Sequence, residues 1–329
     1  MSRRRRNSHT LSTSGVQALE DRQLKTGNVT VELSAADSGD VIIEGDDSDN
    51  FILITEVDAH HIRVSGLFRP QDTSNGSYSN RGYADRTLIN GGTSSVTLRV
   101  TDDVRIRMGG GNDEVTIRDL NLVNRDHSDL MIDLGDGNDR LETDSVDVRR
   151  LMDVDGGNGR DELIVSETTA HVLKVDGEYG NDTLLLDEVT TGNDVVVDGG
   201  EGVDTITIRD SVAGDDLRIT GDAGNDHIQV DGVGVVDDLV VDGGSSDDVI
   251  NVAESHADDI LVYGGSGDDS VSVRDNQITD LLFVDLGTGD DSLDFLSNQV
   301  GRHSFNGGPG NDIWFSTEFW WSWRNFWNF

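Results

Sequence analysis

A turn of the form Gly-Gly-x-Gly-x-Asp returns about every 22 residues from residue 101 onward. Copies include GGNGRDELIV (156–165), GEYGNDTLLL (177–186), GDAGNDHIQV (221–230) and GGSGDDSVSV (264–273). We number the six residues of this glycine turn 1 to 6, so that the aspartate is at position 6. Ten such aspartates follow one another, the first two 26 residues apart and the others 21 or 22. This regularity predicts a stacked array of repeats, in which each repeat contacts only its neighbours.

Apolar residues fall two apart after each aspartate, for example Ile206 and Ile208. A period of two indicates a strand with one buried face. A second pattern, Asp-apolar-x-apolar, lies ten residues before most of these aspartates and begins at Asp216, Asp238 and Asp259. These patterns therefore predict that each repeat, or rung, consists of a strand, a polar turn, a second strand and the glycine turn. The predicted fold is all-β: a right-handed parallel β-helix or β-roll solenoid of about twelve rungs of about 22 residues.

The residues before 101 fit this frame less well. VIIEGDDSDNFILI (41–54) has Asn50 at the aspartate position, and HIRVSG (61–66) and LINGGTSSVTL (88–98) look like pieces of further rungs. Four segments follow from these patterns. They are an Arg-rich, targeting-like segment (1–27), degenerate rungs (28–100) with a polar surface insertion (67–87), a regular solenoid (101–315) and an aromatic tail (316–329).

Acidic residues outnumber basic ones 64 to 25, which gives a formal net charge of −39. A compact fold with that charge repels itself unless counter-ions bind. Only two lysines occur, so a basic face for nucleic acid is excluded. The chain contains no cysteine, and no run of apolar residues is long enough to predict a transmembrane helix.

The glycine turn has residue types that suit calcium. Position 4 is glycine in every copy except one, where Ser246 stands. A glycine there predicts positive φ or a close backbone approach, and such a turn can direct several carbonyl oxygens at one point. The aspartate adds carboxylate oxygen, and two stacked turns can supply the six to eight oxygens that Ca²⁺ requires. The alternative is that Gly, Asn and Asp serve the turn conformation alone, without metal.

The tandem motif resembles the nonapeptide G-G-x-G-x-D-x-U-x of the RTX (haemolysin-type) calcium-binding proteins. The resemblance covers the turns of residues 101–315 and implies that Ca²⁺ is held by carbonyls and aspartates of successive turns. The implied side-chain ligands are Asp113, Asp139, Asp161, Asp182, Asp204, Asp226, Asp248, Asp269, Asp291 and Asp312. The implied backbone ligands come from Gly156, Gly199, Gly243, Gly264 and Gly307.

Each repeat carries one nonapeptide, whereas RTX nonapeptides are usually contiguous. We therefore expect one calcium ladder rather than two, with about nine ions in the gaps between ten turns. Two turns depart from the motif at position 2, where Glu178 and Asp222 replace glycine.

The two ends of the chain carry signals of their own. SRRRR (2–6) and VQALEDRQLK (16–25) resemble the N-terminal segment of large planctomycete surface proteins, which implies export; the alternative is a disordered basic tail. All five tryptophans lie in WFSTEFWWSWRNFWNF (314–329). We expect this segment to cap the open end of the solenoid. A membrane-interface or carbohydrate contact and a secretion signal are the alternatives.

These features predict a non-enzymatic, calcium-dependent structural or adhesive protein at the cell surface or outside the cell. Its partners are calcium and, we expect, a surface glycan or matrix. The alternative is a polysaccharide-active β-helix enzyme, a lyase or epimerase, which needs a positioned base and cationic groups on one face. The residues available for that role are His60, His61, Arg105, Arg107 and Arg118, and they do not recur at the 22-residue spacing. A third possibility is that the repeats are only the folding and secretion module of a larger ancestral protein.

Overall fold

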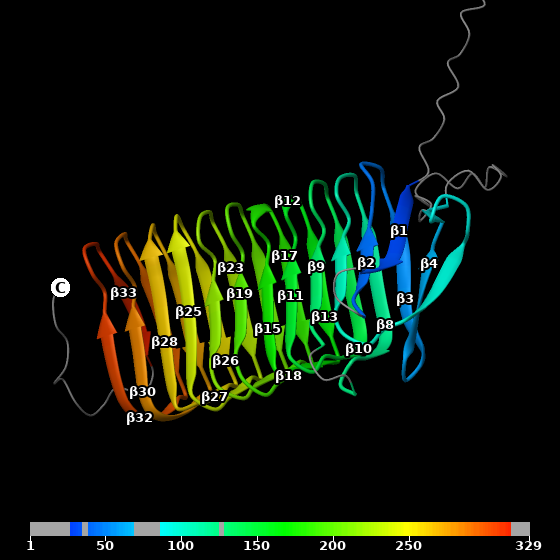
Figure 1. Cartoon of the computed structure of the whole chain (residues 1–329). Helices are drawn as coiled ribbons and strands as arrows, with labels where there is room; N and C mark the ends of the chain where they lie inside the picture. The colour runs from blue at the N-terminus through cyan, green and yellow to red at the C-terminus, as the bar shows by residue number, and fades with distance from the viewer. Residues whose placement is uncertain (1–26, 35–38, 69–85, 125–127, 317–329) are drawn as a thin grey trace, which may run out of the picture.

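The protein is a long stack of parallel strands, seen in a computed structural model that describes residues 27–34, 39–68, 86–124 and 128–316 (Figure 1). About ten rungs with a spacing of about 22 residues follow one another. The described residues contain no α-helix, and therefore no helix that could span a membrane. The predicted all-β parallel solenoid is confirmed.

Three rows of strands run along the stack. The first row begins directly after the turn aspartates and comprises β8 (Glu114–Asn121), β10 (Arg140–Asp147), β13 (Glu162–Ser166), β17 (Thr183–Asp187), β20 (Thr205–Arg209), β23 (His227–Asp231), β26 (Val249–Ala253), β29 (Ser270–Arg274), β31 (Ser292–Leu296) and β33 (Ile313–Ser316). The second row consists of the short strands β14 (Thr168–Ala170), β18 (Thr190–Thr191), β21 (Val212–Ala213), β24 (Gly234–Val235) and β27 (His256–Ala257).

The third row leads into the glycine turns. It comprises β7 (Val104–Arg107), β9 (Leu130–Asp133), β11 (Leu151–Asp155), β15 (Val172–Asp176), β19 (Val195–Asp198), β22 (Leu217–Thr220), β25 (Asp238–Ser245), β28 (Asp259–Ser266), β30 (Gln277–Asp285) and β32 (Gln299–Asn306). Within two glycine turns, β12 (Asn158–Gly159) and β16 (Tyr179–Gly180) pair with each other. The glycine turns therefore line one long edge of the stack, where β12 lies in Figure 1.

Parallel pairing stacks the same residue of successive rungs. Leu184 pairs with Ile206, and Ile206 with Ile228, so an unbroken aliphatic column fills the interior. These side chains are fully buried, because the alternation along each strand turns every second residue inward.

The polar turn expected between the two strands contains a strand of its own. A residue with positive φ, such as Glu167 (φ 45) or Glu188 (φ 55), turns the chain, and a short second-row strand follows. In β14 the inward residues are Thr168 and Ala170, both at most 4% exposed. Their small size and mixed polarity give no apolar alternation, so the sequence pattern does not reveal this strand.

The prediction of further rungs at 61–66 and 88–98 is wrong. After β1 (Asn28–Leu33) and β2 (Val41–Glu44), β3 (Phe51–Asp58) forms an antiparallel hairpin with β4 (His61–Gly66), and β4 pairs antiparallel with β6 (Ser95–Arg99). The tight turn after Asp58 sends the chain back, because the Asp58 carboxylate accepts a hydrogen bond from the His60 amide. A two-residue strand, β5 (Leu88–Ile89), pairs with β1. These strands lie at the N-terminal end of the stack and replace two of the twelve expected rungs.

Three of the segments predicted from the sequence lie wholly or mostly outside the described residues. They are the Arg-rich segment with its export-like motif, most of the insertion 67–87 and the aromatic tail after residue 316.

The prediction for position 4 of the glycine turn is confirmed. Gly224 has φ 144 and Ser246 has φ 87, and a β-carbon at Gly224 would overlap the carbonyl oxygen of Gly202 in the preceding rung. Glycine at this position therefore lets the turns stack closely, and among the ten turns that end in aspartate Ser246 is the one position 4 residue with a β-carbon.

Replacing Gly224 by alanine is expected to destabilise the protein by at least about 1–3 kcal/mol, because the new methyl overlaps backbone that cannot move aside. Thermal unfolding followed by circular dichroism measures this. The matched control is Gly92→Ala, where a β-carbon meets nothing within 4 Å. Equal melting temperatures for the two variants would contradict the close stacking.

Candidate metal centre

The predicted ligand aspartates form one buried column along the glycine-turn edge. From Asp113 to Asp291 each of the nine is at most 2% exposed, and Asp312 in the last rung is half-buried. Their side chains point inward because they continue the alternation of the first-row strands. Ile206, for example, lies two residues after Asp204 and is also buried. The structure thus places all ten predicted side chains in register.

One carboxylate oxygen of each aspartate sets this register. The backbone N–H of Asp182 donates to Oδ1 of Asp204 at 2.7 Å, and that of Asp204 donates to Oδ1 of Asp226 at 2.7 Å. The same bond links every successive pair from Asp113 to Asp312. Oδ1 is therefore a structural acceptor for the rung before.

The other carboxylate oxygen is different. Oδ2 of each of the nine aspartates from Asp113 to Asp291 is buried and has no hydrogen-bond partner. An unsatisfied buried acceptor costs about 1–3 kcal/mol, and more when it is charged. A cation beside these oxygens would therefore stabilise the fold.

In the six rungs from Gly156 to Gly264, Oδ2 lies close to a second oxygen, the carbonyl oxygen of position 1 in the next rung. A β-carbon built on Gly243, at position 1, would lie 2.6 Å from Oδ2 of Asp248 and 2.6 Å from the carbonyl oxygen of Gly264 in the next rung. At Gly199 the equivalent distances, to Asp204 and Gly221, are 3.0 and 3.1 Å. Carboxylate and carbonyl oxygens of adjacent rungs thus converge beside position 1, and such oxygen donors suit a hard cation such as Ca²⁺.

Asn50 supplies a hydrogen-bond donor at the aspartate position of the first rung. It occupies position 6 of the first rung, is fully buried, and donates through Nδ2 to the carbonyl oxygens of Ser48 (2.6 Å) and Asp46 (3.3 Å) of its own turn. A β-carbon on Gly45 would lie 3.0 Å from this Nδ2, where the aspartate rungs place Oδ2. An amide donor therefore stands in the first rung where the other rungs have an unpartnered oxygen. Position 50 was recognisable from the sequence, but its role as a built-in donor was not.

Burial raises the pKa of the column aspartates, and the carboxylates of neighbouring rungs raise most of them further. The pKa of Asp226 rises to about 7, mainly through burial and then through Asp204 and Asp248, while the hydrogen bond from the Asp204 amide opposes the rise. The pKa of Asp113 rises to about 8 and that of Asp248 to about 6, with burial again the main cause. Ionised carboxylates in this column therefore require compensation by cations.

The two departures at position 2 leave the column intact. Glu178 (φ 63) and Asp222 (φ 67) adopt the left-handed conformation that glycine has elsewhere, with exposed side chains. Asp182 and Asp226 in the same turns are as buried as the other aspartates, and each keeps an unpartnered Oδ2.

Acidic groups outside the column also come close together, and two of the three groups are poorly suited to a metal. Carboxylate oxygens lie within 4.8 Å of one another in three groups of the described residues: Asp40, Asp102 and Asp103; Asp155, Asp176 and Glu178; and Asp215, Asp216 and Asp237. In the first, Asp40 already pairs with Arg105; in the third, all three residues are exposed. Along the edge opposite the column, Asp216 and Asp259 accept amide hydrogen bonds from the next rung and lie at the surface.

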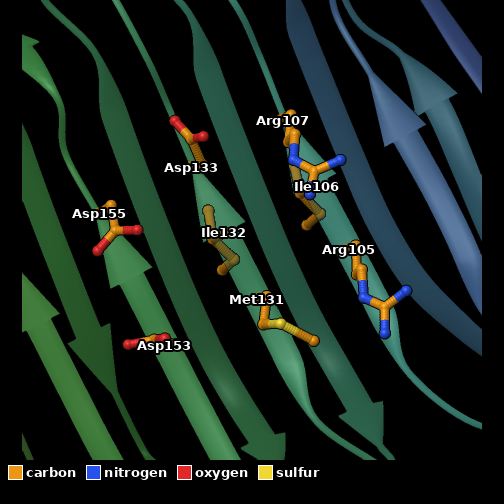
Figure 2. Close-up of a pocket in the computed structure, with 8 residues that line it drawn as sticks. All are labelled: Arg105, Ile106, Arg107, Met131, Ile132, Asp133, Asp153 and Asp155. Carbon is orange, nitrogen blue, oxygen red and sulfur yellow. The ribbon is translucent and has the colours of Figure 1, made fainter.

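A hollow of about 190 Å³ lies on the outer face of β7, β9 and β11 (Figure 2). Arg105 and Arg107 stand on one side of it, and Asp153 and Asp155 on the other. Of the residues considered for catalysis, only these two arginines line it. Arg105 is held by Asp40 (2.6 Å) and Asp103 (2.9 Å), Arg118 pairs with Glu142, and His61 pairs with Asp58.

No known protein family matches the chain, and no match is found among curated proteins. Among solved structures, the chain is similar to the X-ray crystal structure of a hyperactive, Ca²⁺-dependent, β-helical antifreeze protein from an Antarctic bacterium. The TM-score is 0.41 at 21% sequence identity, over 64% of this chain and 78% of that one. The overlap is too loose for the properties of that protein to be carried over.

Without metal, stability is expected to fall as the pH rises from about 4 to about 8. The folded pKa of Asp161, Asp182 and Asp269 is about 7, well above the ordinary value of 3.8, so the folded state holds protons that the unfolded chain has lost. Bound calcium needs ionised carboxylates, so the stabilisation that calcium adds is expected to grow over the same range. Melting temperatures of metal-stripped and calcium-loaded protein between pH 5 and pH 8 measure both trends. A metal-free melting temperature that rises with pH would contradict the assignment.

Proposed function

We propose that the protein is an exported calcium-binding repeat protein of the RTX kind, with a structural or adhesive role and calcium-dependent folding. The observation that carries this proposal is the column of nine buried Oδ2 atoms without partners, six of which lie beside a carbonyl oxygen of the next rung. The residues that would hold calcium are the column aspartates through Oδ2 and position 1 of the following rung through its carbonyl. Bound there, calcium supplies positive charge between rungs.

The stacking geometry supports calcium-dependent folding. Strands in neighbouring rungs are about 4.8 Å apart, so ionised aspartates one rung apart repel each other inside the protein. With free calcium at ten times Kd, each site adds about 1.4 kcal/mol to the free energy of unfolding. Several independent sites then add on the order of 10 kcal/mol, as much as the net stability of a whole domain.

The proposed compartment is supported by the affinity typical of extracellular calcium modules and by the N-terminal segment. Calcium modules outside the cell typically bind at about 10⁻⁴ to 10⁻³ M, a range that cytosolic calcium does not reach. The export-like motif of residues 2–25 supports the same location. We therefore place the protein at the cell surface or outside the cell, with a glycan or matrix component as its partner.

A non-enzymatic role is part of the proposal. The hollow that holds Arg105 and Arg107 is the one observation that favours the alternative, a polysaccharide-active enzyme, because it gathers cations and carboxylates on one face. Arg105 is engaged by two aspartates, and none of the eight lining residues is a histidine, lysine or tyrosine. A screen of acidic polysaccharides for cleavage or epimerisation separates the two functions, and turnover abolished by Arg107→Ala would establish the enzyme.

The direct test is to titrate calcium into EDTA-stripped protein and follow far-UV circular dichroism. We expect a sharp transition from coil to β-structure at or below millimolar calcium, which magnesium at equal ionic strength does not reproduce. Unchanged β-structure without calcium would mean that the glycine turns serve conformation alone.

The Asp204→Asn variant tests the role of the bound ion separately from the role of the turn conformation. The asparagine keeps the Oδ1 acceptor and, like Asn50, offers an amide donor to its own turn. We expect this variant to bind one ion fewer, to be more stable than the wild type by about 1–3 kcal/mol in EDTA, and less stable in calcium. Unfolding curves in both conditions and metal analysis measure this.

Glu201→Gln is the matched control for Asp204→Asn. Glu201 lies in the same turn, is exposed, and loses the same charge. We expect it to leave the ion count unchanged. The same response from both variants would show that net charge, rather than the buried column, governs calcium binding.

A further inference from the structure

Position 1 of the glycine turn divides the rungs into two kinds. Six consecutive rungs have glycine there: Gly156, Gly177, Gly199, Gly221, Gly243 and Gly264. The two rungs before this run have Met108 and Leu134, and the rung after it has Leu286. The three apolar side chains are fully buried. Position 1 thus changes from apolar to glycine and back to apolar between Met108 and Leu286. Gly45 in the first rung and Gly307 in the last are also at position 1, but Asn50 replaces the aspartate in the first rung, and no described rung follows the last one to supply a carbonyl oxygen.

The backbone at position 1 is the same in both kinds of rung. The N–H of Leu134 donates to the carbonyl of Asp155 at 3.0 Å, that of Leu286 to Asn306 at 2.9 Å, and that of Gly199 to Thr220 at 2.9 Å. Each of these acceptors is the residue that precedes position 1 in the next rung. A side chain at position 1 therefore leaves the backbone in the same direction everywhere, inward and beside the aspartate column.

In the six glycine rungs, the place of the missing β-carbon is where the two oxygens converge. At every one of them Oδ2 of the same rung's aspartate and the position 1 carbonyl oxygen of the next rung lie no more than 3.2 Å from that place. At Gly264 the carbonyl is that of Leu286, so a leucine at position 1 still offers its backbone oxygen to the rung before. A leucine at position 1 instead fills the space beside the aspartate of its own rung.

We propose that the residue at position 1 decides which rungs hold an ion. The ladder then consists of six sites, whose carboxylates are Asp161, Asp182, Asp204, Asp226, Asp248 and Asp269. Met108, Leu134 and Leu286 fill the equivalent space with carbon and close the ladder at both ends. This inference rests on the proposed function, and it lowers the expected number of ions from about nine to six.

The closed ends have a structural consequence. The first rung carries its own amide donor at Asn50, and Met108 and Leu134 fill the space at position 1 of the next two, so these N-terminal rungs leave no room for an ion there. They form a metal-independent end on which the six calcium rungs stack. Calcium removal is therefore expected to loosen residues 156–269 first.

Counting ions in variants that open or close one site tests the proposal. Leu286→Gly opens a site between Asp291 and the carbonyl of residue 307, and Gly221→Ala places a β-carbon 2.7 Å from Oδ2 of Asp226. After gel filtration in calcium buffer with excess magnesium, we expect elemental analysis to give six ions per chain for the wild type. Leu286→Gly is expected to bind seven and Gly221→Ala five.

Gly234→Ala is the control, since a β-carbon there meets only a Val212 methyl at 3.8 Å, and it is expected to keep six ions. Nine ions in the wild type, or six in both Leu286→Gly and Gly221→Ala, would overturn the role of position 1 while calcium binding stands. If Leu286→Gly does not fold, five ions in Gly221→Ala support the proposal and six contradict it. A wild type without bound calcium would instead overturn the proposed function.

Discussion

An aspartate side chain that points into a parallel solenoid lies directly beside the equivalent aspartate of the next rung, and this constraint organises the whole glycine-turn edge. Parallel stacking places identical residues about 4.8 Å apart, so one inward aspartate per repeat becomes a buried acidic column. Oδ1 is satisfied by the amide of the preceding rung, which locks the 22-residue register. Oδ2 has no partner in the protein and creates the demand for a cation.

The glycines serve this column in two distinct ways. At position 4 they allow the turns to stack closely, because a β-carbon on Gly224 would overlap the carbonyl of Gly202. At position 1 they leave open the space into which Oδ2 of one rung and a carbonyl of the next both point. The consensus Gly-Gly-x-Gly-x-Asp is therefore the pattern that brings a buried carboxylate, a carbonyl oxygen of the next rung and an open space together in the six rungs from Gly156 to Gly264.

Most of this fold could be predicted from residues such as Asp204, Ile206 and Ile208, whose spacing fixes both the period and the inward face. The short strand at Thr168–Ala170 could not, because small and polar inward residues leave no apolar alternation. Nor could the antiparallel hairpin of β3 and β4, since parallel and antiparallel strands share the same period of two. The donor role of Asn50 and the apolar residue at position 1 depend on where side chains point within a turn, which spacing alone does not reveal.

The most direct measurement is X-ray diffraction from crystals grown with calcium, with data collected at a long wavelength to record its anomalous signal. We predict a single row of anomalous peaks along the glycine-turn edge, each within about 2.3–2.6 Å of an aspartate Oδ2 and of a carbonyl oxygen of the following rung. Peaks confined to the surface carboxylates, or a column without anomalous signal in calcium-saturated crystals, would contradict the account.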